Sequence, residues 1–551
     1  AAFFAAPEPT TPDVVPLPKS GMSDAPLSVV GSSAMLPSGA VSEALVWRMS
    51  ASGQDMISQV PATRWQTPDS LGQLPAEVAL RMQHGGFLLE AELFDNAFFG
   101  ISPAEATVMD PQQRLLLERS YEALHAAGQR RSDLLGSGTG VHVGVWACEW
   151  AAVLRENPLG RSVYAATASA CSVLVGRVSF ALGLQGPCVS YDTACSSSLA
   201  ALHGGSRSLQ HVECRTSLVA GVNMLFDPNT SLGTASAGMT SAGGRCHTFD
   251  TRADGFCRGE ACAAVALQAL EQANAVRVVC GSAVRQDGRS ASLTAPNGLA
   301  QRALLLAAFA DAGVTPASLA RIEAHGTGTA LGDPTEAGSL AATLCGRASG
   351  RASPLAVGAA KASIGHSEAA SGQAGLQRMV GALGQLSAGG NAQLHQLNPL
   401  VGELWRGAAA ALGTQQVQAG RGGGPHPDCC CNLSTSPNPS LNPDPHQVQV
   451  GSGGAGPVGG VSSFGYSGTI AHAVLQSAPG GAAALAVGGS VALRFRRRAF
   501  PWAPLVQRTY MPLVAPATPF LGSISERSAT SVVWEQQFSP FELAFLQGHR
   551  V

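Results

Sequence analysis

The chain has 551 residues, of which 45% are hydrophobic and 13% charged, so it can bury a large core and exceeds one ordinary domain. Its 34 basic and 36 acidic residues give a formal net charge of -2. This near balance argues against a nucleic-acid partner, because general nucleic-acid binders carry a basic face. No apolar run approaches the about 18 residues that a membrane span needs, so we expect no membrane association.

Thirteen cysteines are scattered without a Cys-x-x-Cys pair. This pattern favours reduced thiols over a disulfide framework, and it predicts an intracellular, reducing compartment, either cytoplasm or organelle. The run at 429–431, flanked by His426 and His446, has poor chelate geometry, so no metal is expected. The chain begins with Ala1 and stops at Val551, as expected for a piece of a longer polypeptide.

The elements predicted along the chain alternate in type. Residues 1–26 are rich in Pro, Ala and Thr and are interpreted as a linker or tail, after which a strand is expected at 27–31. The patterns predict strands at 141–145, 189–191, 320–324, 355–358, 458–463 and 471–476, and helices at 110–127, 197–210, 299–312 and 369–386. This alternation favours an α/β architecture with layered helices and sheets.

Two later stretches interrupt the alternation. Residues 414–457 contain almost no packing residues and are interpreted as a disordered surface insertion. From Gly480 a Gly/Ala-rich linker leads to the basic cluster Arg494–Arg498, which we interpret as a solvated linker face.

The segment from Tyr191 to Leu199 carries the first chemical signal. Its sequence, Tyr-Asp-Thr-Ala-Cys-Ser-Ser-Ser-Leu, ends an apolar strand, turns through small residues and begins a helix with Leu202 and Leu209 on one face. Cys195 is thereby placed at or near a helix N-terminus. Unsatisfied N–H groups there favour a thiolate, and the residue's own amide points to where an oxyanion would form. This placement favours a nucleophile over a buried structural thiol.

Three further segments combine glycines with functional side chains. They are Glu323–Thr329 (Glu-Ala-His-Gly-Thr-Gly-Thr), Lys361–His366 (Lys-Ala-Ser-Ile-Gly-His) and Ser463–Thr469 (Ser-Phe-Gly-Tyr-Ser-Gly-Thr). His325 and the second histidine stand in loops beside predicted strands or helices, and the glycines around the tyrosine let the backbone approach a substrate closely. Each segment alone is a weak signal, because a lone histidine is usually structural.

Together and in this order, the four segments resemble the β-ketoacyl synthase family, specifically the ketosynthase domains of modular type I polyketide synthases. Stretches at 110–114 (Asp-Pro-Gln-Gln-Arg), 244–250 (Gly-Arg-Cys-His-Thr-Phe-Asp) and 253–256 (Ala-Asp-Gly-Phe) are similar as well. The resemblance runs from about residue 27 to 478, apart from the insertion. Ile470 departs from the common Asn of the pattern Gly-Thr-Asn-Ala-His, which is expected to loosen its loop.

The resemblance implies the thiolase fold, with two similar α/β halves in an α-β-α-β-α layering and a post-ketosynthase linker. By residue-to-residue match, Cys195 would be the acyl-accepting nucleophile. His325 and His366 would polarise the malonyl thioester carbonyl and support decarboxylation, and Lys361 would help to set the local electrostatics.

The same match names the binding groups. The backbone amides of Cys195 and Tyr466 would form the oxyanion hole, and Thr327 and Thr329 would contact the phosphopantetheine arm. No cofactor would be bound by this domain itself, since substrates arrive on the phosphopantetheine of an acyl carrier protein. The implied partners are a second copy in a homodimer, the acyl carrier protein and neighbouring synthase domains.

The domain boundaries implied are a tail (1–26), a nucleophile half (27–270), a half with both histidines (271–478), a linker (479–515) and the truncated start of a dehydratase domain (516–551). In the linker, Phe500, Trp502 and Tyr510 would dock back onto the ketosynthase. His549 matches the beginning of the dehydratase family's histidine motif.

Rival interpretations of the four segments differ in what they require. A Cys-His hydrolase would need an orienting Asn or Asp and open water access, and two histidines in Gly-rich loops fit condensation better. The glycines at 136–140 are better explained by a turn than by a dinucleotide site, because no strand precedes them and no helix follows. A ketosynthase of a type I fatty acid synthase, and a non-elongating gatekeeping or scaffold ketosynthase, remain open at this point.

We predict that residues 414–457 can be replaced by a short Gly/Ser linker with little loss of activity or melting temperature. The stretch lacks apolar periodicity, and loop closure entropy changes by only about 0.6 kcal/mol per doubling of length. Thermal unfolding and activity of the deletion variant check this, and a large drop in melting temperature would contradict it.

Overall fold

The computed structural model describes residues 26–65, 74–146, 149–155, 157–269, 277–345, 351, 354–384, 389–413, 456–477 and 493–502, with the backbone of 523–527 and 532–535. The expectations for the N-terminal tail, for nearly all of the 414–457 insertion, for Tyr510 and for His549 lie outside the described residues.

Two groups of strands repeat one pairing pattern. The first group has the order β1-β8-β7-β5-β6, and the second has the order β9-β14-β13-β10-β11 with β12 added at its edge. In each group the first three strands pair antiparallel and the remaining neighbours pair parallel. A short antiparallel contact between β1 and β9 joins the groups. The repeat corresponds to the two similar halves that were expected.

The seven predicted strands are present with similar bounds, although the first extends to Met35, and the strands at 216–223, 261–269, 277–286 and 410–412 were not predicted. The first group consists of β1 (Leu27–Met35), β5 (Gly140–Gly144), β6 (Cys188–Tyr191), β7 (Thr216–Asn223) and β8 (Ala261–Ala269). The second consists of β9 (Arg277–Gln286), β10 (Leu319–Glu323), β11 (Leu355–Gly358), β12 (Ala410–Leu412), β13 (Val458–Phe464) and β14 (Thr469–Ser477).

Two helices form a central layer between the groups. α8 (Ser197–Gln210) contacts β5 and β7 on one side and β14 on the other, and α13 (Ser371–Ala382) contacts β8 and β13. Every residue of α13 is buried, and both helices are rich in Ser, Ala and Gly, whose small side chains let the two sheets approach. Leu199, Leu202 and Leu376 pack in one core cluster with strands of both halves.

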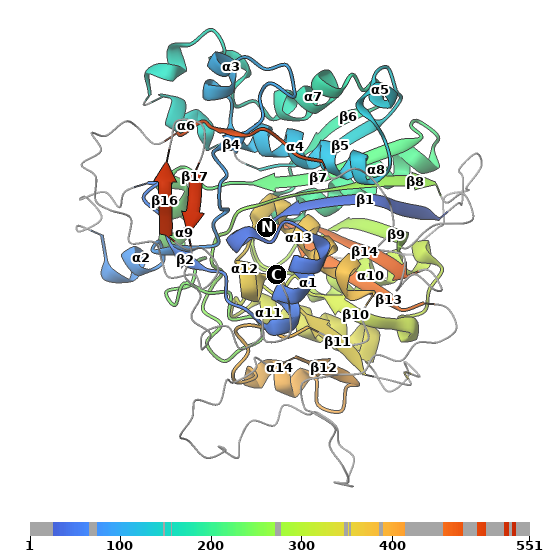
Figure 1. The fold of residues 1–551 in the computed structure, drawn as a ribbon. Helices are drawn as coiled ribbons and strands as arrows, with labels where there is room; N and C mark the ends of the chain where they lie inside the picture. The colour runs from blue at the N-terminus through green and yellow to red at the C-terminus, as the bar shows by residue number, and fades with distance from the viewer. Residues whose placement is uncertain are drawn as a thin grey trace, which may run out of the picture.

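Outer helices complete the layers (Figure 1). α4 (Pro111–Ala126) covers β1 and β8, and α10 (Gly298–Ala312) covers β9 and β14. The order helix, sheet, helix, sheet, helix confirms the thiolase layering. The other described helices are α1 (Glu43–Ser52), α2 (Ala76–Leu80), α3 (Pro103–Val108), α5 (Arg131–Leu134), α6 (Trp150–Arg155), α7 (Cys171–Leu182), α9 (Pro228–Ser236), α11 (Gly332–Leu340), α12 (Lys361–Ile364) and α14 (Pro399–Leu404). Short strands are β2 (Ser58–Gln59), β3 (His84–Gly85), β4 (Leu93–Phe94), β15 (Arg498–Ala499), β16 (Ser523–Arg527) and β17 (Val532–Glu535).

Capping residues explain where the predicted helices begin. The Asp110 carboxylate accepts from the Gln112 N–H at 2.8 Å, and the Asn297 side chain accepts from the Leu299 N–H at 3.0 Å. The helix predicted at 369–386 begins only at Ser371, because a 3-10 turn at Glu368–Ala370 precedes it. None of the helices in the described ranges combines the length and apolar surface needed to cross a bilayer.

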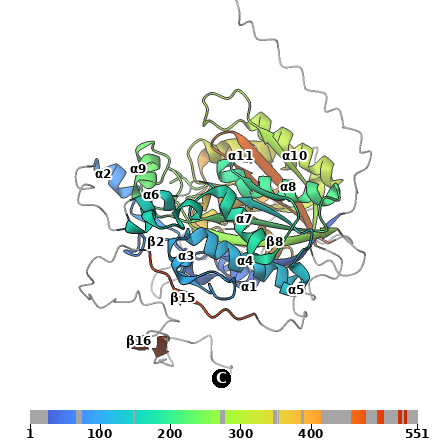
Figure 2. The ribbon, with the colours of Figure 1, turned by 90° about the horizontal axis from the view of Figure 1, so that it is seen from above.

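The segment 493–502 crosses the first half beside α4 and pairs through β15 with β4 (Figure 2). Phe500 and Trp502 are buried in the first core cluster, and the Trp502 indole N–H donates to the Thr63 carbonyl at 2.9 Å. The Arg114 guanidinium donates to the Phe500 carbonyl at 3.1 Å. The docking expected of these two aromatics is therefore present.

Candidate active site

Cys195 lies in a strained turn between β6 and α8. The preceding Ala194 has φ of 55°, a left-handed conformation that is costly for a residue with a Cβ atom. The Ser197 hydroxyl donates to the Ala194 carbonyl at 2.6 Å and accepts from the Thr193 N–H at 2.9 Å, while Asp192 accepts from the Ala194 N–H at 3.2 Å. These bonds hold the turn, and they place Cys195 in a 3-10 turn directly before α8, as predicted.

Two backbone amides face the sulfur. The N–H groups of Cys195 itself and of Tyr466 lie near enough to Sγ of Cys195 to lower the pKa of its thiol. The loop with Tyr466 lies so close that a Cβ atom on Gly465 would be 2.4 Å from the Thr193 carbonyl oxygen, which explains the glycine. The Ser463 hydroxyl donates to the Cys195 carbonyl at 2.6 Å. The structure thus brings together the two amides named as an oxyanion hole.

The Cys195 thiol is protonated in this substrate-free site. Burial raises the pKa of Cys195 to about 12, and the negative charge of Glu368 adds to the rise. Lys361 and the two amides lower the pKa, but by less than burial raises it. The expectation that the helix end would favour a thiolate is wrong here, because the cost of burying an unpaired charge is larger.

The side chains of both predicted histidines, His325 and His366, lie next to each other. Their ring centroids are 5.5 Å apart with an interplanar angle of 88°. The His325 Nδ1 atom accepts from the Phe464 N–H at 3.2 Å, and the His366 Nδ1 atom accepts from the Glu368 N–H at 3.3 Å. In a neutral ring these bonds assign the proton to Nε2, so each histidine offers an Nε2–H donor. The buried His366 Nε2 atom has no partner among the described residues.

The charge state of the histidines follows from burial and from Lys361. Burial lowers the pKa of both rings well below the usual value, and Lys361 lowers it further. Lys361 is itself buried, which lowers its pKa, while Glu323 and Glu336 oppose that shift. Two neutral N–H donors beside a buried cation suit stabilisation of a developing oxyanion.

Thr327 and Thr329 lie in the loop that follows His325. Their hydroxyl oxygens are 3.2 Å apart, and the Thr329 hydroxyl also accepts from the Gly332 N–H at 3.1 Å. Thr327 is buried, and Thr329 is partly exposed. The two hydroxyls form one polar patch in the loop that carries His325.

Two carboxylates that hold this loop were not predicted from the sequence. Glu336 accepts from the N–H groups of His325 at 2.7 Å and Gly326 at 2.8 Å. Asp333 accepts from the Gly328 N–H at 3.0 Å, and burial raises the pKa of Asp333 to about 7. Both carboxylates lie on α11, and the only signal in the sequence was the short Gly-Asp-Pro run after the histidine loop.

Ile470 does not loosen its loop. It is fully buried in the core of the second half and pairs with Phe464 across β13 and β14. The turn is closed by the Gly465 N–H bond to the Thr469 carbonyl at 2.8 Å and the Gly468 N–H bond to the Gly465 carbonyl at 2.9 Å. The departure from the family pattern is therefore absorbed by core packing.

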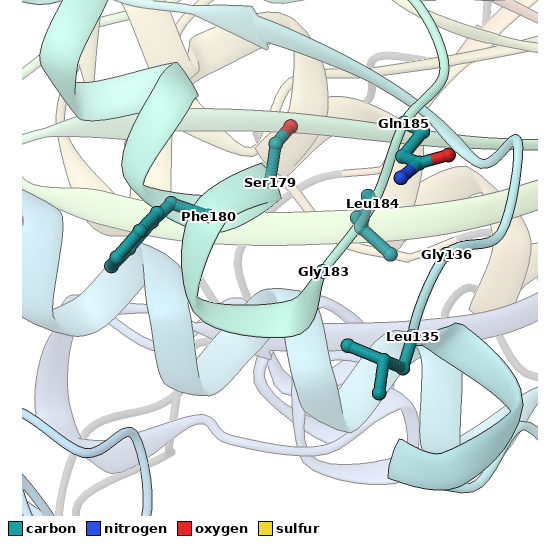
Figure 3. A pocket seen from close by; sticks show the side chains of 7 residues that line it. All are labelled: Leu135, Gly136, Ser179, Phe180, Gly183, Leu184 and Gln185. Atoms are coloured by element: carbon teal, nitrogen blue, oxygen red, sulfur yellow. The ribbon is translucent and has the colours of Figure 1, made fainter.

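A sizeable cavity, of about 390 Å³, lies away from Cys195, at the end of α7. Figure 3 shows its lining, which comes from α7 and the loop that follows it and from residues after α5. The lining residues are Leu135, Gly136, Ser179, Phe180, Gly183, Leu184 and Gln185. No group of three or more His, Cys, Asp or Glu side chains in the described ranges is arranged to hold a metal ion.

We predict that alkylation of Cys195 by iodoacetamide becomes about tenfold faster per pH unit from about pH 7 to pH 10. The reactive thiolate keeps increasing with pH because the pKa is about 12. Mass spectrometry of the labelled peptide measures the rate, with Cys195→Ala as the control for exposed Cys188. A plateau below about pH 8 would contradict the prediction.

Comparisons with known proteins agree with this geometry. Residues 24–273 match the family model of the β-ketoacyl synthase N-terminal domain, and residues 276–389 match that of the C-terminal domain. One phenolphthiocerol/phthiocerol polyketide synthase protein of Mycobacterium tuberculosis is 43% identical over 390 residues, which cover 69% of this chain and 21% of that relative. A second protein of the same synthase and organism is 39% identical over 471 residues, covering 84% and 24%. The chain thus spans less than a quarter of the length of these curated relatives.

Solved structures give the same result. The ketosynthase from module 6 of the bacillaene synthase of Bacillus subtilis 168 superposes with a TM-score of 0.69 and 28% identity, covering 82% of this chain and 72% of that one. The oxazolomycin ketosynthase domain of Streptomyces albus JA3453 gives a TM-score of 0.69, with 83% and 74% covered. The relatives do not favour a fatty acid synthase. This chain belongs to the β-ketoacyl synthase family and is a ketosynthase of the modular polyketide synthase type, an acyltransferase by reaction class.

Proposed function

We propose that Cys195 accepts an acyl chain from one carrier and that His325 and His366 direct its decarboxylative condensation with malonyl on an acyl carrier protein. One observation carries this proposal. Two backbone amides lie near enough to Sγ of Cys195 to lower its pKa, and the two neutral histidines of the site each carry their proton on Nε2. This arrangement suits two successive oxyanions, since the amides and both Nε2–H groups are hydrogen-bond donors.

The first step is acyl transfer to sulfur. Sγ of Cys195 attacks the thioester carbonyl, the new C–S bond forms, and the bond to the pantetheine sulfur breaks. The proton of the Cys195 thiol leaves with the released pantetheine thiol, so the exchange consumes no net base. The amides of Cys195 and Tyr466 would stabilise the tetrahedral oxyanion, and the product remains an activated thioester.

The second step makes the carbon–carbon bond. The bond between the malonyl α-carbon and its carboxylate breaks, carbon dioxide leaves, and the electron pair forms an enolate whose oxygen accepts from Nε2–H of His325 and His366. The enolate carbon attacks the Cys195 thioester, the C–S bond breaks, and the sulfur takes up one proton. Lys361 favours this path because its positive charge keeps both imidazoles neutral and stabilises nearby anions.

Thr327 and Thr329 would hold the phosphopantetheine arm, since their hydroxyls lie in the loop that carries His325. No separate cofactor would then be needed, because the acyl and malonyl groups arrive already activated on the carrier. We retain as proposals the halves 27–270 and 271–478, the linker 479–515 and a dehydratase beginning at 516–551. Neighbouring synthase domains would supply the carrier and process the product.

We propose that two copies associate through β6, which lies at the end of the sheet order. Cys188 and Val189 on this strand are exposed, and the nearby Phe180 side chain is 87% exposed beside the cavity of Figure 3. An unpaired strand edge with exposed apolar neighbours is suited to pairing with a second copy. Antiparallel pairing of two β6 strands would join the sheets of two chains.

We predict that Val189→Asp converts the dimer to a monomer, because two buried carboxylates would face each other across the two-fold axis. Sedimentation velocity measures the change in mass. Leu306→Asp, at an exposed leucine of α10 on the other half, is the matched control and is expected to leave the dimer intact. Equal masses for wild type and Val189→Asp would contradict the assignment of this edge.

We predict that Cys195→Ala abolishes both acylation and condensation while the fold persists, because the neighbouring turn residues are small. His325→Ala and His366→Ala should keep acylation within a few-fold and lower decarboxylation about 100-fold or more, since each removes one oxyanion donor. Intact-protein mass spectrometry with an acyl N-acetylcysteamine thioester follows the first reaction. Release of carbon dioxide from a malonyl carrier protein follows the second.

The same measurements test the remaining alternative. A non-elongating gatekeeping ketosynthase would add the acyl mass at Cys195 but would form no β-ketoacyl product from the malonyl carrier. Retention of Cys195, His325, His366 and Lys361 in one site supports elongation. Condensation by Cys195→Ala at the wild-type rate would overturn the nucleophile.

A further inference from the structure

Arg258, Glu368 and Glu149 form a buried ion triad near His366. The Arg258 guanidinium pairs through Nε with Glu368 Oε1 at 2.6 Å and through a terminal nitrogen with Glu368 Oε2 at 3.1 Å. The same terminal nitrogen donates to Glu149 Oε1 at 2.8 Å. Arg258 is 4%, Glu368 3% and Glu149 6% exposed, so the one positive charge offsets part of the two negative charges away from water.

This triad is connected to the backbone of His366. The His366 N–H donates to the Cys257 carbonyl at 2.6 Å, and the Gly259 N–H donates to the His366 carbonyl at 2.8 Å. Arg258 therefore stands between the two residues that bind His366 on either side. Its side chain also binds the loop of His366, because the guanidinium pairs with Glu368, two residues further along the chain.

Glu368 connects the ion triad to the His366 imidazole, since its carboxylate pairs with Arg258 and its N–H bonds the ring. Its φ of 45° is left-handed, which an unsupported glutamate would rarely adopt. In this conformation its N–H donates to Nδ1 of His366 at 3.3 Å, the bond that leaves the ring proton on Nε2. The bidentate ion pair between Arg258 and the Glu368 carboxylate stabilises this strained backbone conformation.

We propose that Arg258 is a positioning residue for the condensation: by gripping Glu368 it keeps His366 in the Nε2–H form and aimed at the malonyl carbonyl. The inference rests on the proposed function, since it concerns how His366 is prepared for its step. The side-chain partners of Arg258 are Glu368, Glu149 and Ser231, and Cys195 is not among them. Removal of Arg258 should therefore impair decarboxylation and spare the acylation of Cys195.

The charge of Arg258 acts in the same direction as its geometry. Burial lowers the pKa of His366 most, followed by Lys361 of α12 and then by Arg258. The other titratable groups that face this ring are His325 from the loop after β10, Glu368 on its own turn and Cys246, near its backbone N–H. Loss of the Arg258 charge raises the pKa of His366. During acidification the ring is therefore protonated, and its neutral form lost, at a higher pH than in wild type.

Two substitutions separate the effect of the bidentate hydrogen bonds of Arg258 from the effect of its positive charge. Arg258→Lys keeps the positive charge but can bond the carboxylates only as a point donor, whereas Arg258→Gln removes the charge as well. In the full-length chain, we expect Arg258→Lys to lower release of carbon dioxide from malonyl carrier protein about 10- to 100-fold. Acylation of Cys195 by hexanoyl-N-acetylcysteamine should stay within about twofold of wild type.

The pH profile supplies the second readout. For Arg258→Gln we expect the acid limb of the decarboxylation profile to move to higher pH, while in Arg258→Lys it stays where wild type has it. Arg177→Lys is the matched control, because Arg177 is a buried arginine that pairs with Glu105 far from the sulfur. Thermal unfolding of each variant shows how much fold is lost, and if Arg258→Gln does not fold, the two partial reactions of Arg258→Lys decide.

The inference alone is overturned if Arg258→Lys decarboxylates at the wild-type rate, or if it slows both partial reactions to the same extent as Arg177→Lys does. An unmoved acid limb in folded Arg258→Gln overturns the part played by charge. If wild type itself takes no acyl group on Cys195, the proposed function fails and this inference fails with it.

Discussion

Burial determines the resting protonation state of the site. Burial is the largest cause of the shifted pKa values of Cys195, His325 and His366, and in each case it favours the neutral form. A neutral thiol and two neutral imidazoles can share a small space without repulsion. They also leave N–H donors ready for charge that appears only during the reaction, when stabilisation lowers the barrier most.

The neutral site is held by charged groups just outside it. Glu336 binds the backbone of His325, and Glu368 binds the ring of His366 while Arg258 compensates its charge. Each of these carboxylates accepts hydrogen bonds from the main chain or from a guanidinium, so its burial is offset. The consequence is that the two histidines need no charge of their own, because their orientation is imposed by hydrogen bonds to the backbone.

Local pattern was sufficient to predict seven strands of the large sheet and the two central helices, but it missed β7, β8, β9 and β12. That four loops would meet at Cys195 was implied by the family resemblance and not by periodicity. Strand ends followed by small residues and a helix are visible as a change of periodicity, and the structure places Cys195 and both histidines accordingly. Arg258, Glu149 and Glu336 could not be found in this way, because their roles depend on contacts between segments distant in sequence. The sign of the Cys195 pKa shift also escaped prediction, since a helix end is a local feature and depth of burial is not.

The internal repeat explains why the site forms where it does. β6 and β11 hold the same position in their two groups, and each is followed along the chain by a central helix. A short turn with Cys195 joins β6 to α8, whereas β11 leads to α13 through a longer segment that contains α12 with Lys361, then His366 and a 3-10 turn. His325 follows β10, and Tyr466 follows β13, the neighbouring strands of the parallel part. Every group therefore lies at the carboxyl end of a parallel-paired strand, where loops and helix starts converge between the halves. One half supplies the nucleophile with its own amide, and the other half supplies both histidines and the Tyr466 amide.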